Sequence, residues 1–158
     1  MKKTTIGMIS FLGGCVFSTY KITRLCQKAM KAEEKLIEKN SINFKIMYNW
    51  LKGYQTGRKI TDILEREKIN EIAIYGMGDL GRTLLKELEN TDISVKYVID
   101  RNNYRSFGAH SCYSPFDDLP DVQAVIVTPV SDFENIAEQL RKKTEAHLIP
   151  LNKVIDQL

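Results

Sequence analysis

Residues 72–82 read IAIYGMGDLGR, and this stretch decides the expected fold. An apolar run of strand-forming residues leads into three glycines spaced G-x-G-x-x-G, and leucines at helical spacing follow. This succession of strand, turn and helix is the setting in which the spacing marks a phosphate-binding turn. The stretch therefore predicts a Rossmann-like βαβ unit.

Each glycine of the turn has its own predicted role. Gly76 allows the tight turn out of the strand, and Gly81 lets the following helix pack closely on the sheet. Gly78 has no Cβ, so a phosphate group can approach the backbone there. The helix adds free N–H groups and the positive end of its dipole. The predicted cofactor-binding residues of the turn are Gly76, Met77, Gly78, Asp79, Leu80 and Gly81.

An acidic residue follows the second apolar run. Asp100 directly follows the apolar run at residues 95–99 and lies about 20 residues beyond the last glycine. In Rossmann-like folds, a carboxylate at this distance accepts hydrogen bonds from the ribose hydroxyls of the ligand. The charge of Asp100 disfavours a ribose with a 2′-phosphate, although the adjacent Arg101, also a predicted site residue, weakens that preference. Thr128 and Pro129 follow the third main strand and are expected to form the far wall of the site.

The remaining pattern places this unit in a small α/β domain. The expected strands are 71–75, 95–99, 109–113, 122–128 and 147–151, and the expected helices after the glycine turn are 79–89, 131–141 and 152–157. Their alternation predicts a small Rossmann-like parallel sheet with helices on both sides, preceded by an N-terminal helical segment.

Helices are also expected ahead of the sheet. Residues 21–39 form an amphipathic helix, Asn40 and Ser41 end it and cap a second helix through residue 54, and residues 58–67 form a third. Trp50 is expected to pack on the sheet domain. The predicted organisation is an anchor or amphipathic helix over 1–40, a helical lead-in over 41–69 and a nucleotide-binding domain over 70–158.

Charge is distributed unevenly along the chain. Residues 1–59 hold 12 Lys and Arg against 3 Asp and Glu, a charge of +9, whereas residues 60–158 hold 11 against 17, a charge of −6. A basic segment ahead of an acidic domain indicates an anionic membrane surface or an acidic partner. Nucleic acid is not an expected partner, because the basic residues alternate with apolar helix positions and no nucleic-acid motif accompanies them.

Residues 4–20 are uncharged and moderately apolar, and they are short for a membrane span, where about 20 residues are typical. Three interpretations stay open: a retained anchor or interfacial helix, a cleaved signal or lipoprotein segment (residues 12–15 read LGGC), and a soluble packing or oligomerisation helix. We favour membrane association through residues 4–39. More Lys and Arg follow residues 4–20 than precede them, which favours a cytoplasmic main domain.

No catalytic residue or metal ligand is predicted. The three cysteines have no metal-binding spacing, and their odd number indicates a reducing compartment. His110 and His147 lack companions that would complete a metal site. Residues 48–52 read YNWLK, a pair that is catalytic in short-chain dehydrogenases, but here it precedes the glycine turn and is interpreted as coincidence.

Several segments resemble a known family. They are IYGMGDLGR at 74–82, VIDRN at 98–102, and DDLP at 117–120 followed by VIVT at 125–128. They resemble the nucleotide-binding domain that leads the membrane-bound nucleotide-sugar epimerases and dehydratases of bacterial polysaccharide biosynthesis, which is also similar to a CoA-binding Rossmann module. The resemblance covers about residues 42–155. It implies a domain that binds NAD or another nucleotide, with a nucleotide-sugar or CoA as alternatives, but it does not include the catalytic domain of those enzymes.

Three functional hypotheses follow. The first is a membrane-associated, cytosol-facing module that binds a nucleotide or nucleotide-sugar. The second is an NAD-dependent enzyme similar to the nucleotide-sugar epimerases and dehydratases, which needs a general base in the crevice. The sequence offers no general base with a convincing partner in that crevice. The third hypothesis is a scaffold or partner protein that kept the fold and uses its helical N-terminus for assembly, for which a homo-oligomer is one possible form. The sequence favours the first.

Overall fold

The computed structural model describes the backbone of residues 2–102 and 106–158, and the side chains of these residues from Lys21 onward. The chain divides into two compact units, residues 1–40 and residues 41–158. Helix α1 (Lys2–Gln55) is continuous through Asn40 and Ser41, so the predicted helix break is wrong. Asn and Ser disfavour a helix interior only weakly, and the helical pattern on both sides of them prevails.

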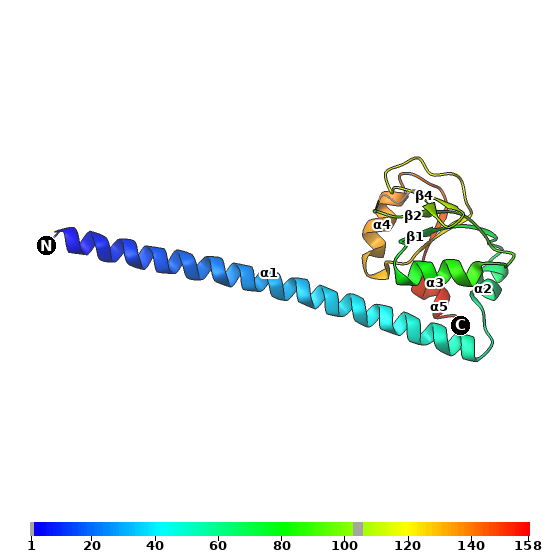
Figure 1. Ribbon diagram of the computed structural model, residues 1–158, viewed down its shortest axis with the longest axis horizontal. Helices are drawn as coiled ribbons and strands as arrows, with labels where there is room; N and C mark the ends of the chain where they lie inside the picture. Colours follow the sequence, from blue (N-terminus) through cyan, green and yellow to red (C-terminus); the bar gives the residue numbers. More distant parts are fainter. Residues whose placement is uncertain (1, 103–105) are drawn as a thin grey trace. The chain divides into compact units, whose positions relative to one another are not determined.

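A six-stranded sheet forms the centre of the second unit (Figure 1). The strands are β1 (Glu71–Tyr75), β2 (Ser94–Ile99), β3 (Ser106–Phe107), β4 (His110–Tyr113), β5 (Ala124–Val127) and β6 (His147–Pro150). Their order across the sheet is β3-β4-β2-β1-β5-β6. All neighbours pair in parallel except β3, which runs antiparallel to β4. The sequence did not predict β3.

The central strands β1 and β5 are buried on both faces, as in a parallel sheet that carries helices on each side. Ile72 and Ile74 of β1 belong to one apolar cluster, whereas Ala73 and Tyr75 belong to another. This alternation follows from the period of two along a strand. The predicted fold class, a Rossmann-like α/β sheet with helices on both sides after an N-terminal helix, is confirmed.

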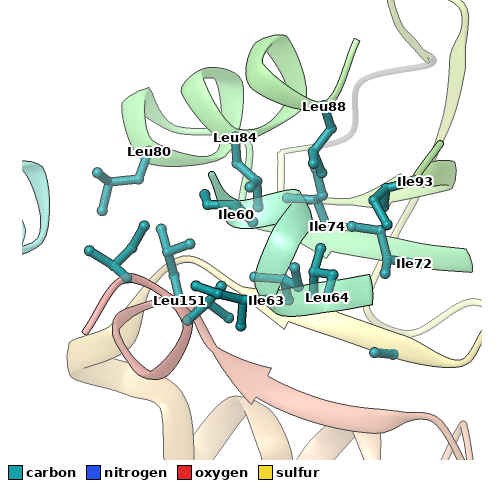
Figure 2. Close-up of a cluster of buried hydrophobic side chains, with 14 of the residues drawn as sticks. Ile60, Ile63, Leu64, Ile72, Ile74, Leu80, Leu84, Leu88, Ile93 and Leu151 are labelled. Carbon is teal, nitrogen blue, oxygen red and sulfur yellow. The ribbon is translucent and has the colours of Figure 1, made fainter. Parts of the chain in front are cut away.

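Four helices cover the first face and one covers the second. The first cluster takes in side chains of α2 (Ile60–Arg66), α3 (Asp79–Leu88), α5 (Leu151–Ile155) and the end of α1. Figure 2 shows Leu80, Leu84 and Leu88 of α3 directed toward side chains of α2 and the sheet. The second cluster takes in α4 (Phe133–Leu140), which follows a short 3₁₀ turn, η1 (Val130–Asp132).

The lead-in helices are part of this same core. Trp50 is buried, which confirms the prediction that it packs on the sheet domain. Its indole N–H donates to the Glu87 carboxylate on α3, which also accepts a hydrogen bond from the backbone N–H of Ile60 on α2. One carboxylate therefore connects α1, α2 and α3.

A membrane-spanning helix is not found among the described residues, where no helix is both long and apolar enough to cross a bilayer. The prediction of an anchor over residues 4–20 concerns side chains outside the described part of the chain. It therefore stays a prediction.

Candidate functional site

The candidate site lies where the chain changes direction across the sheet. Strands β2, β3 and β4, which follow β1 in the sequence, lie on one side of it in the sheet. Strands β5 and β6, which come later in the sequence, lie on the other side. In open parallel sheets, ligands bind beyond the carboxyl ends of the strands at such a switch point. The glycine turn follows β1, Asp100 follows β2, and Thr128 follows β5, so the predicted residues gather at this edge.

Two of the three glycines are required by the fold itself. Gly76 has φ +89°, and a Cβ there would lie 2.7 Å from Cδ of Pro129. A Cβ on Gly81 would lie 2.0 Å from the carbonyl oxygen of Gly76, closer than any real contact. The roles predicted for these two glycines, a tight turn and close approach of α3, agree with this geometry.

Gly78 is different. Its φ of −74° is open to any residue, and no atom lies within 4 Å of the position a Cβ would take. It is the N-cap of α3 and gives the helix no side-chain cap. Neither backbone strain nor packing therefore requires glycine at this position.

The side chains around the turn divide into inward and outward groups. Met77 and Leu80 are buried in the first apolar cluster, so a ligand at the turn would contact their backbone atoms. Asp79 is exposed at the first turn of α3. Its carboxylate is favourable beside the positive end of the helix dipole, and it competes there with any other anion.

Both backbone polar groups of Met77, its N–H and its carbonyl, make hydrogen bonds to side chains. Its N–H donates to Oδ2 of Asp100 at 2.6 Å, and its carbonyl oxygen accepts a hydrogen bond from Nε of Arg82 at 3.0 Å. The Arg82 guanidinium also lies over the ring of Phe107, 5.6 Å from its centre. The turn is thus pre-organised, since contacts from α3, β3 and the end of β2 fix it.

Asp100 has a structural role that the sequence did not reveal. It is buried, and its second oxygen, Oδ1, accepts the backbone N–H of Asn102 at 2.8 Å. A carboxylate has about four acceptor positions, so each oxygen keeps one for a further donor. The predicted contact with a ribose would use these remaining positions, and it stays a prediction.

Arg101 and Thr128 also make internal contacts. Arg101 donates to the Tyr75 hydroxyl at 3.3 Å and to Asp132 at 3.0 Å, and these bonds raise the pKa of its guanidinium above the usual value. Asp132 is the N-cap residue of α4, but its carboxylate makes no side-chain cap to that helix. The Thr128 hydroxyl donates to the Gly76 carbonyl oxygen at 2.7 Å.

Four contributors to the site were missed from the sequence: Tyr75, Arg82, Phe107 and Asp132. Arg82 directly follows the last glycine, and this position next to the motif was the available signal. The other three make contacts between residues far apart in the chain. Their sequence positions alone carry no sign of these contacts.

The Cys112 thiol lies near Asp100 at the edge of the site but is not a reactive thiol. Burial raises the pKa of the Cys112 thiol, and the Asp100 charge raises it further, so Cys112 is protonated at neutral pH and is a poor nucleophile. Among the described residues, no group of three or more His, Cys, Asp or Glu is placed to hold a metal ion.

Comparison of the chain with protein-family models, curated proteins and solved structures finds no match. The family resemblance noted from the sequence therefore stays a prediction.

Proposed function

We propose that residues 41–158 form a nucleotide-binding module that holds a diphosphate at the turn from Gly76 to Gly81. The observation that carries this proposal is Gly78. The fold explains the other two glycines of the motif but not this one, and a phosphate in contact with the backbone would explain it.

The backbone of the turn suits an anion, although the exposed Asp79 carboxylate competes for the same place. The first N–H groups of any helix have no acceptor within the helix, and the dipole of α3 adds positive potential at the same place. Open space above Gly78 lets an oxygen come within hydrogen-bond distance of these groups. Two hydrogen bonds, which the Met77 N–H donates to Asp100 and the Met77 carbonyl accepts from Arg82, fix the turn before a ligand arrives.

The ligand class follows from Asp100. A carboxylate accepts hydrogen bonds from free ribose hydroxyls, and it repels a 2′- or 3′-phosphate on the same ring. The Arg101 charge that would offset this repulsion is engaged with Asp132. We therefore propose NAD or a nucleotide-sugar as the ligand ahead of NADP and CoA.

The biological setting is proposed from the resemblance and from the charge pattern. The module would act in cell-surface polysaccharide biosynthesis, with its sheet domain in the cytoplasm and residues 4–39 on or in the membrane. A chain that begins at Ser41 should then be soluble, and the full chain should float with anionic vesicles. High salt should release the full chain if only its basic residues bind, but not if residues 4–20 insert, because insertion is not screened. A full chain that fails to float at low salt would contradict this part of the proposal.

A panel of ligands tests the binding function. Thermal unfolding of the full chain is followed with NAD, NADP, a UDP-sugar and CoA. A ligand at 100 times its dissociation constant adds about 2.7 kcal/mol to the stability of the folded state. NAD or the UDP-sugar should raise the midpoint more than NADP or CoA does. If none of the four changes it, the proposal fails and a scaffold that kept the fold becomes the better explanation.

A further inference from the structure

The end of α1 has two apolar faces. One face packs on the sheet domain through Ile46, Trp50 and Gly53. A neighbouring face is exposed, and its side chains are 56–76% accessible; they are Phe44, Met47, Tyr48, Leu51 and Tyr54. A helix that is apolar on two faces is typical of a helix that is buried on both. We call this exposed set the outer face of α1.

The spacing of the outer face is that of a helix–helix seam. Phe44, Met47, Leu51 and Tyr54 follow one another at intervals of three, four and three residues. These are the a and d positions of a heptad, the pattern by which two helices pack side by side. The two lysines of this segment, Lys45 and Lys52, are seven residues apart and therefore lie together on one flank of the helix.

A groove adjoins the outer face on its other flank. It has a volume of about 280 Å³ and lies between α1 and α3, and its lining is almost entirely apolar. Met47, Leu51 and Tyr54 of the outer face form one wall, and Leu80 and Thr83 of α3 contribute to the other. The same patch thus presents both an apolar ridge and an apolar hollow beside it.

We propose that the outer face of α1 is the interface with a second copy of this chain. A two-fold interface uses the same patch on both subunits, so it must be complementary to itself. A ridge beside a groove meets this requirement, because each copy can place its ridge against the groove of the other.

The size of the patch supports the same occupant. At roughly 200 Å² for each large apolar side chain, the outer face exposes on the order of 600 Å². That is at the upper limit for an unused apolar patch on a monomer and close to the roughly 800 Å² that each partner buries in a stable complex.

Charge argues against a lipid bilayer as the occupant. The exposed carboxylate of Asp79 lines the groove beside the outer face, and an anionic leaflet would repel it. In an interface between two copies, Asp79 can remain at the solvated rim. A second copy therefore agrees better with the patch than a membrane surface does.

Sedimentation equilibrium of the full chain in a density-matched non-ionic detergent tests the interface. We expect a dimer of the 18.1 kDa chain, and we expect Leu51→Glu to raise the dissociation constant at least 100-fold. Phe116→Glu is the matched control, since Phe116 is also a large exposed apolar residue but lies far along the chain, and it should leave the dimer intact. A monomeric wild type, or a Leu51→Glu variant that associates as tightly as wild type, would overturn the proposal.

Cross-linking provides a second readout that does not depend on disrupting the dimer. In a chain whose three native cysteines are changed to serine, Leu51→Cys should form disulfide-linked dimers under mild oxidation. Lys45→Cys, on the flank of the same helix, should form few. Equal yields from the two variants would contradict the interface. A monomer that loses vesicle binding on Leu51→Glu would assign the outer face to lipid and would also overturn the proposal.

Discussion

Substituting Gly81 with alanine should be severe, whereas the same change at Gly78 should be mild. A Cβ at residue 81 would lie 2.0 Å from the carbonyl oxygen of Gly76, and real Cβ contacts stay above 3.0 Å, so α3 must move by about 1 Å. Overpacking of this kind costs about 1–3 kcal/mol. The Gly76 carbonyl also accepts the Thr128 hydroxyl, and weakening that hydrogen bond adds about 1 kcal/mol.

We therefore expect Gly81→Ala to destabilise the sheet domain by about 3 kcal/mol, which corresponds to a fall in the unfolding midpoint on the order of 10 °C. Gly78→Ala introduces a methyl group into open space at an ordinary φ, so its effect should stay within about 1 kcal/mol.

Fluorescence of Trp50 follows both variants. It is the only tryptophan, and it is buried in the core of the sheet domain, so its emission reports on this domain and not on the rest of α1. If Gly81→Ala melts within 2 °C of wild type, the close approach of α3 to the turn is wrong. If Gly78→Ala is as destabilising as Gly81→Ala, the fold itself requires Gly78, and the argument for a ligand at that position is lost.

Two further predictions concern buried polar groups. Asp100→Asn leaves a single oxygen to accept hydrogen bonds from the N–H groups of both Met77 and Asn102. It should therefore lower the free energy of unfolding, measured in urea, by about 1–3 kcal/mol. An unchanged urea midpoint would show that the carboxylate does not hold the turn. Burial raises the pKa of Tyr97 from 10.0 to about 12, and its hydroxyl donates to Pro120, so the unfolded chain loses this proton first as the pH rises. The contribution of Tyr97 to the free energy of unfolding should be complete below pH 10 and fall by up to about 3 kcal/mol toward pH 12. The fall in the free energy of unfolding should be smaller in Tyr97→Phe. Equal pH profiles for wild type and Tyr97→Phe would exclude the effect.

The parts of the fold that local pattern controls were predictable. The burial alternation of β1 and the helical leucines of α3 follow from periods of two and 3.6 residues. The turn between β1 and α3 was predictable because G-x-G-x-x-G restricts the backbone itself. The end of α3 was also predictable, because Asn90 adopts a positive φ of 61° that Asn tolerates well.

The parts that depend on distant contacts were not predictable. Strand β3 has only two residues, too few for any periodic signal. The continuity of α1 through Asn40 reflects the surrounding helix and not the propensity of that residue. Asp100 was correctly singled out, but its bond to the Met77 N–H joins residues 23 positions apart, and no local pattern encodes it.

The central claim is that the turn from Gly76 to Gly81 binds a phosphate group. Calorimetric titration of the full chain and of Gly78→Val with the ligand that gives the largest thermal shift tests it most directly. Ser94→Val, at the exposed amino end of β2 and so away from the turn, serves as the control that should bind as wild type does. We expect Gly78→Val to remain folded and to lose binding, because the branched side chain occupies the space that the phosphate needs. Equal affinity of wild type and Gly78→Val would contradict it.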